Sequence, residues 1–488
     1  MVRLIAPIFL LLAGLAAGLA AARYGLLAAI TTLGGLLAGV GAFFFPWAGL
    51  LTALSLAILL PFGVLPIRSG VSPSLLEVIL LGCLGGWLLP PLLHKERRWP
   101  FSWPDALVWL LIAWTTFALL LGWPHGGNTN VLNNHVEFML ALATFFAVRQ
   151  LARDPRRRRQ FIAVLLLAAG LAALVGLALY ALPDATSLDL LVRLGPLGYP
   201  TSGRVLRYVE DNPAGLERAI GTAVDPNSFG GMLALAAAVA LGEVLAHWPW
   251  ARGKKAPHLS TTPSPRHPVT PSSRQGAREL PLALLLPILL VLIPCLYLTH
   301  SRAALGGLVV AGLFLVAARY RRLWWAILVV VALTAVVVLA LGLDHPVVAR
   351  FTQGLTFQDL SNQMRLDEYA DAWTVVRRYP LLGVGFGNAP DADLTLGVSS
   401  IYLTVAERMG LVGLIAFLGA VSGACGRALS LSRHARDGQA GRRIALLAGV
   451  VAALAIGLLD HYFFNPDFPH MATLLWATLG LACAKVDG

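Results

Sequence analysis

Two arginines stand beside long apolar segments of this 488-residue chain and could bind an anion there: Arg218 and Arg302. A guanidinium group stays charged and presents five N–H donors in a planar fork, which suits bidentate binding of a phosphate. Arg302 lies between two consecutive apolar segments, where burial in hydrocarbon would cost about 2.5–3.5 kcal/mol, so we expect an anion nearby. The alternatives are that Arg302 reaches lipid headgroups and that Arg218 is a solvated charge.

The segment 365–388 combines a helical pattern with a glycine-rich turn. Its apolar residues recur at helical spacing and predict one apolar face of a helix that lies along the membrane surface: Leu366, Tyr369, Ala370, Trp373 and Val376. Tyr379-Pro380 ends this helix, and the glycines at 383, 385 and 387 allow a sharp turn or a close approach to a ligand. A nucleotide-binding loop is excluded because these glycines follow a helix rather than a strand.

Membrane-spanning helices must position these residues. Hydrophobic residues make up 57% of the chain and charged residues only 13%, against roughly a quarter charged in soluble domains. Apolar runs long enough to cross about 30 Å of hydrocarbon recur along the whole chain, without the short alternating segments of a β-barrel. The sequence therefore predicts an all-α polytopic transmembrane bundle of about 12–14 spans, near 4–22, 25–42, 48–64, 73–92, 103–121, 136–152, 160–182, 227–247, 280–298, 302–318, 323–343, 401–424, 444–459 and 470–485.

Charge sets the expected orientation of these spans. Basic residues gather in five short segments that all fall on one side, which we expect to be cytoplasmic: 95–98, 149–159, 252–278, 319–322 and 427–443. The segments 183–225 and 344–400 hold four basic residues each, against six and seven acidic ones, and are expected on the outer face. Both termini are then cytoplasmic. Asp225 is expected to cap the helix that follows the first outer loop, with Pro226 at its first position.

This orientation divides the chain into five parts. We expect N-terminal scaffold spans at 1–182, a periplasmic loop at 183–226, spans at 227–343 with a flexible cytoplasmic linker at 249–280, a large, partly helical periplasmic loop at 344–400, and C-terminal spans at 401–488. The linker is rich in Pro, Ser, Thr and basic residues, which bury little apolar surface. Asn133-Asn134-His135, before the sixth span, is predicted to be a polar turn.

Several function classes fit the sequence poorly. The four cysteines are far apart inside or beside apolar runs, so they predict small core residues rather than a metal site or disulfides: Cys83, Cys295, Cys425 and Cys483. The net charge of +12 lies in short loops and indicates topology rather than nucleic-acid binding. A transporter stays an alternative, although charged residues are almost missing from the middle of the predicted spans.

Across about 205–475 the motifs resemble the O-antigen ligase and O-antigen polymerase (Wzy-type) family of bacterial membrane glycosyltransferases. The resemblance rests on the Arg-x-x-Gly-Thr segment from Arg218, the Ser-Arg-x-x-x-Gly turn at 301–306, and a long outer loop at the expected place. It also rests on residues in and after that loop: Arg365, Trp373, Tyr379-Pro380-Leu381, Tyr402-Leu403, Glu407, Gly410 to Leu414, and Asp460-His461.

The resemblance implies an enzyme of the bacterial inner membrane that moves glycan from an undecaprenyl-pyrophosphate carrier to a glycan or lipid acceptor. The partners would be these substrates and membrane lipids, with no nucleic acid, and the transfer would need neither nucleotide sugar nor metal nor any other cofactor. By the same resemblance, Arg218 and Arg302 would bind the carrier pyrophosphate, and Arg365 would shape the outer loop or assist them. Charge-assisted bonds from these arginines would stabilise the leaving group.

One departure from the family pattern concerns the catalytic base. Ser399-Ser400 occupies the position where family ligases carry His-Asn, and serine alone is a poor proton acceptor near neutral pH. Replacement bases could be His461, Asp393 or His300, with Asp391 and His345 as further candidates. The other interpretation is a non-catalytic relative that binds or helps to handle a lipid-linked polysaccharide.

Overall fold

The structure is a computed structural model that describes residues 2–66, 73–93, 101–248, 280–342, 360–391, 393–435 and 437–485. Within these ranges the chain is helical and contains no β-strand beyond two isolated bridges. The predicted linker at 249–280 lies outside the described residues except for its last residue, and His345 lies outside them entirely. The all-α prediction is confirmed for the part of the chain that the structure describes.

Each of the fourteen predicted spans falls on a helix, and two further helices, at 184–192 and 360–378, lie in the predicted loops. The helices are α1 (Val2–Tyr24), α2 (Leu26–Phe44), α3 (Pro46–Leu59), α4 (Leu75–Leu93), α5 (Trp103–Gly122), α6 (Thr129–Leu151), α7 (Pro155–Ala181), α8 (Asp184–Val192), α9 (Pro226–Ala246), α11 (Leu282–Leu298), α12 (Arg302–Ala318), α13 (Trp324–Leu341), α15 (Leu360–Arg378), α16 (Ile401–Arg433), α17 (Asp437–Ile456) and α18 (Pro469–Cys483). Among the described residues, eight helices are long and apolar enough to cross a membrane, and shorter apolar helices lie between them.

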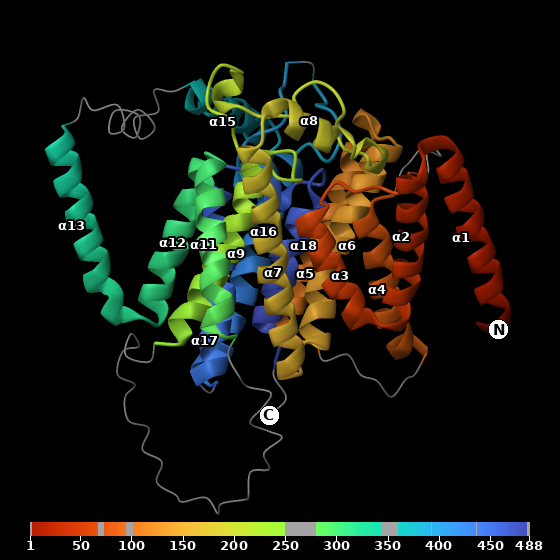
Figure 1. Cartoon of the computed structure of the whole chain (residues 1–488), viewed down its shortest axis with the longest axis horizontal. Coiled ribbons are helices and arrows are strands. Elements are labelled where there is room, and N and C mark those ends of the chain that lie inside the picture. Colours follow the sequence, from red (N-terminus) through yellow and green to blue (C-terminus); the bar gives the residue numbers. More distant parts are fainter. Residues whose placement is uncertain are drawn as a thin grey trace, which may run out of the picture.

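Helix α9 forms the centre of the bundle. It packs against α7, α11, α12 and α17, and almost all of its side chains are buried. Its small residues permit this close packing, since a Cβ on Gly242 would collide with Ala445 of α17. At the edge of the bundle, α13 stands apart (Figure 1), and most of its described apolar side chains are exposed, as expected for contact with lipid.

Several boundaries differ from those predicted: α16 continues to Arg433 rather than ending near 424, and α17 begins at Asp437 rather than near 444. Helix α3 ends at Leu59 rather than near 64, because Pro61 lacks a backbone N–H and cannot continue the helix. The prediction of a polar turn at Asn133-Asn134-His135 is wrong, since these residues belong to α6. Asn128 begins that helix early: its side-chain oxygen accepts hydrogen bonds from the backbone N–H groups of residues 130 and 131.

Helices α8 and α15 lie at the same end of the bundle (Figure 1). The buried side of α15 consists of Ala372, Val375 and Val376. Leu366 and Trp373, predicted on the same apolar face as Val376, are instead half-exposed. The helix therefore packs by a narrower stripe than its sequence pattern indicates, and it leaves two large apolar side chains available to the membrane surface.

The glycine-rich turn after α15 is inserted into a kink of α16. Gly410 has φ 68° and ψ −176°, which breaks the helix. The carbonyls of Glu407 and Arg408 then accept hydrogen bonds from the N–H groups of Val384 and Gly385, at 2.9 Å each. A Cβ on Gly383 or Gly410 would collide with backbone across this junction, and a Cβ on Gly385 would collide with the backbone of α5. The glycines thus permit close backbone packing, and the kink fixes the outer loop to the bundle.

Replacing Gly410 by alanine is expected to destabilise the protein by about 1–3 kcal/mol, since its backbone conformation is strained for any residue with a Cβ. The added Cβ would also collide with the Leu381 carbonyl. Thermal unfolding in detergent measures the effect. The matched control is Gly419→Ala in the same helix, where a Cβ meets nothing within 4 Å. Equal unfolding midpoints for the two variants would contradict this account of the kink.

Candidate functional site

Arg218 is held by two hydrogen bonds at the predicted outer end of the bundle. Its Nε donates to the Thr299 carbonyl at 2.8 Å, and its Nη2 donates to Asn227 Oδ1 at 2.6 Å. Asp225 caps α9, as predicted, by accepting from the N–H groups of Asn227 and Ser228 at 2.9 and 2.7 Å. These bonds fix the guanidinium between the start of α9 and the turn that joins α11 to α12, while some of its five N–H donors remain for a ligand.

Asp460 lies in the electrostatic field of both Arg218 and Arg365. Its side chain is buried at 3% exposure, and Oδ2 has no hydrogen-bond partner among the described residues. Burial raises the pKa of Asp460 to about 7, although the two arginines partly oppose this shift. The structure thus brings together two of the three predicted arginines around one poorly solvated carboxyl group, from segments that are far apart in sequence.

Helix α15 is tied to the segment that carries Asp460. Tyr369 Oη donates to the Leu458 carbonyl at 2.9 Å, and the Ser399 carbonyl lies 3.3 Å from the same hydroxyl. The Ser399 N–H donates to Glu368 Oε2 at 2.9 Å. These bonds position the helix turn that carries Arg365 over Asp460. Ser399 therefore contributes its backbone to the site, which its sequence position alone does not reveal.

His461 follows Asp460 and is half-buried. Burial lowers the pKa of His461, and the nearby carboxylates of Asp225 and Glu368 only partly offset this shift. Its Nδ1 is buried and has no hydrogen-bond partner among the described residues, and its ring packs beside Tyr462 with 4.8 Å between centroids. A neutral imidazole can accept a proton near neutral pH once a substrate reaches its ring nitrogen.

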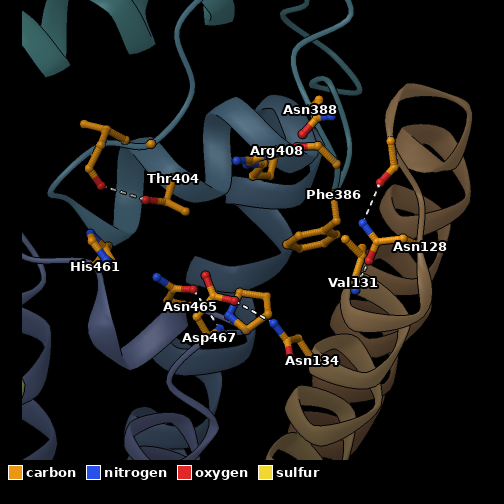
Figure 2. Close-up of a pocket in the computed structure, with 15 residues that line it drawn as sticks. Asn128, Val131, Asn134, Phe386, Asn388, Thr404, Arg408, His461, Asn465 and Asp467 are labelled. Atoms are coloured by element: carbon orange, nitrogen blue, oxygen red, sulfur yellow. Dashed lines mark hydrogen bonds between the residues drawn. The ribbon is translucent and has the colours of Figure 1, made fainter. Parts of the chain in front are cut away.

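A pocket of about 290 Å³ opens beside His461 (Figure 2). Its walls come from the start of α6, the turn after α15, the start of α16 and the loop before α18. Most of the polar side chains that line it are amides or hydroxyls: Asn128, Asn134, Asn388, Thr404 and Asn465, with the carboxylate of Asp467. The pocket and the pair of arginines thus adjoin the same short segment, 460–462.

The other predicted site residues occupy different surroundings. Arg302 is the first residue of α12 and is exposed, at the turn whose Thr299 carbonyl binds Arg218. His300 has a left-handed backbone, with φ 51°, and its ring lies beside Tyr297.

Asp393 forms an ion pair with Arg378 at 2.9 Å, and the hydrogen bonds from Arg378 lower the pKa of this carboxyl. Arg378 also pairs with Asp391 at 3.0 Å. Both aspartates are consequently weaker proton acceptors than a free carboxylate.

Sequence reasoning missed part of this site. The sequence presents Asp460 only as the neighbour of His461, and Tyr369 only as a member of an apolar face. It does not relate Asn128 and Asn134 to Asp467, which lies more than 300 positions further along the chain. The one available signal was a polar pair, Asp460-His461, at the end of an apolar span.

Comparison with known proteins finds one family match, over part of the chain. Residues 287–418 match a protein-family model described as O-antigen ligase, which confirms the predicted resemblance for that part of 205–475. The matched region includes Arg302, Arg365 and Ser399, whereas Arg218, Asp460 and His461 lie outside it. No match to the chain is found among curated proteins.

Proposed function

Because this multi-pass membrane protein carries an O-antigen ligase domain at residues 287–418, we propose that it transfers glycan from an undecaprenyl-pyrophosphate carrier to a glycan or lipid acceptor. The reaction takes place at the periplasmic face of the bacterial inner membrane, with both termini in the cytoplasm, and uses neither metal nor nucleotide sugar. The observation that carries this proposal is the pair Arg218 and Arg365 around the buried carboxyl of Asp460.

In this proposal the arginines bind the diphosphate of the donor. Partial burial strengthens their interaction with an anion, because fewer water molecules screen the charges. Arg218 is already oriented by Thr299 and Asn227, so little conformational entropy is lost when it binds. Arg302, at the neighbouring turn, adds a further cation. The same groups stabilise the negative charge that collects on the leaving diphosphate during transfer.

The acceptor hydroxyl attacks the anomeric carbon of the donor sugar as the bond from that carbon to the diphosphate oxygen breaks. His461 takes the hydroxyl proton, and undecaprenyl diphosphate leaves with both bonding electrons. The place of His461 in the wall of the pocket and its lowered pKa support this role. The ion pairs of Asp393 and Asp391 with Arg378 make these carboxylates weaker candidates.

The direct test is glycan transfer by the purified protein in lipid nanodiscs, supplied with membrane-extracted donor and acceptor lipids. Ser399, at the position of the family histidine, favours a second candidate function: a non-catalytic relative that binds or helps to handle lipid-linked polysaccharide. Donor binding without any transfer would indicate that second function. Uptake of donor into sealed vesicles without transfer would instead indicate a transporter.

The pKa of Asp460, about 7, predicts a pH dependence of donor binding. Below pH 7 the carboxyl is neutral, and above it the carboxylate repels the diphosphate, so affinity should fall as pH rises from 6 to 8.5. A suitable probe is farnesyl-diphosphate-linked N-acetylglucosamine, because a diphosphate diester keeps a constant charge in this range. In Asp460→Asn the affinity should stay flat with pH. An equally steep fall in Asp460→Asn and wild type would exclude Asp460 as the titrating group.

A further inference from the structure

We infer that the pocket beside His461 binds the hydroxyl-rich sugar of the acceptor, an assignment that rests on the proposed transferase function. The pocket has a volume of about 290 Å³, at the small end of the roughly 300–1,000 Å³ that small-molecule sites occupy. It opens at the outer end of the bundle, where α6, the turn after α15 and the loop before α18 meet (Figure 2). This volume suits a sugar unit rather than a long acyl chain.

The lining matches a neutral, hydroxylated ligand. Side-chain amides offer both donors and acceptors, as sugar hydroxyls do, and Phe386 and Val131 add apolar surface for the faces of a sugar ring. Arg408, the arginine of the lining, is directed to the protein itself: its Nη1 donates to the Gly387 carbonyl at 2.6 Å and its Nε lies 3.7 Å from Glu407. Asp467 adds a negative charge. An anionic ligand is therefore disfavoured.

Hydrogen bonds within the protein hold this lining in place. Asn134 Nδ2 donates to Asp467 Oδ1 at 2.6 Å, and the Asp467 N–H donates to Asn465 Oδ1 at 2.9 Å. The Asn388 N–H donates to the His125 carbonyl at 2.7 Å. Gly126 lets Asn388 approach, because a Cβ there would collide with the Asn388 side chain. The amides are thus oriented before a ligand arrives, which lowers the entropy lost on binding.

The position of the pocket would place the acceptor close to the donor. His461 lines the pocket, while the preceding residue, Asp460, lies in the electrostatic field of the two arginines. A sugar hydroxyl in the pocket would therefore lie next to the proposed base, with the donor diphosphate on the other side of the same short segment. Asn128, Asn134, Asn465 and Asp467 all lie outside the matched family region of 287–418. We assign to them the choice of acceptor in this chain.

Two substitutions test this assignment in different ways. Val131→Trp fills the pocket, and Asn134→Leu removes an amide while keeping similar volume. In cells that express each variant in place of the wild type, transferred glycan should fall about 10-fold or more, and carrier-linked glycan, released by mild acid, should accumulate. The matched controls on the same helix are Val136→Trp and Asn130→Leu, whose exposed side chains lie outside the pocket. Both controls should transfer glycan as the wild type does.

Donor binding separates this assignment from the proposed function. The purified pocket variants should bind farnesyl-diphosphate-linked N-acetylglucosamine as tightly as the wild type, which also shows that they are folded. Wild-type amounts of transferred glycan in both variants would overturn the assignment, as would a parallel loss of probe binding. If the wild type neither binds the probe nor transfers glycan, the proposed function itself fails. Thr404→Val, a smaller change in the same lining, should lower transfer with binding intact if the others prove unstable.

Discussion

Replacing Arg218 by glutamine is expected to reduce glycan transfer by about 100- to 1,000-fold, the usual cost of removing one preorganised donor that stabilises developing negative charge. The reason lies in its geometry: the guanidinium is fixed by Thr299 and Asn227 and shares the environment of Asp460 with Arg365. Transfer by purified protein, together with binding of the diphosphate probe, measures the effect. Binding should weaken as well, because the arginine contacts the donor before and during transfer.

The control for this prediction is Arg193→Gln in the same outer loop. Arg193 is exposed and pairs with Asp189 at 2.7 Å, and an exposed pair of this kind contributes little. Its loss should therefore leave transfer unchanged. Arg218→Gln can still donate one hydrogen bond to Thr299 or Asn227, so the fold should survive, and thermal unfolding checks this. Normal transfer in a folded Arg218→Gln protein would remove the main support for the proposed donor site.

The spans were predictable because the length of an apolar run is a local property. A run of about 20 apolar residues must form a helix in hydrocarbon, whatever lies around it. The kink of α16 was not predictable in this way, since 401–424 reads as one continuous apolar span. The break at Gly410 depends on the turn at 380–385, which supplies backbone donors to the carbonyls that the kink releases. The partner segment therefore determines that conformation.

The candidate site was likewise predictable in its residue types but not in the way these residues are grouped. Arg218 and His461 could be selected from the sequence because each is a polar residue at the edge of an apolar segment, and Arg365 could be selected through the family resemblance. Their grouping around residues 460–462 required the fold, since α15, the first outer loop and the loop before α18 are separate in sequence. The burial that raises the pKa of Asp460 and lowers that of His461 is likewise a property of packing. The residue types indicated the kind of chemistry, whereas only the packing indicates which acid or histidine lies near the two arginines.

Replacing His461 by asparagine should reduce transfer by about 100- to 10,000-fold, the range that general-base catalysis supplies, while binding of the diphosphate probe stays near the wild-type value. The lowered pKa of His461 also fixes the sign of the pH dependence. The neutral base is present above its pKa, so transfer at saturating donor should rise along a limb centred below about 6.5, the ordinary value for histidine, and then remain level. His461→Asn should lose that limb.

The comparison variant for this prediction is Asp393→Asn, which changes another candidate base. Because Asp393 is exposed and engaged by Arg378, its loss should change transfer little. Large loss in Asp393→Asn with normal transfer in His461→Asn would assign the base to the outer loop instead. If neither variant changes transfer, the proton leaves by another route, and Asp460, the buried carboxyl beside His461, becomes the group to test. A chain that transfers no glycan in any form, even after Ser399→His, but still binds the diphosphate probe would be a carrier-binding relative.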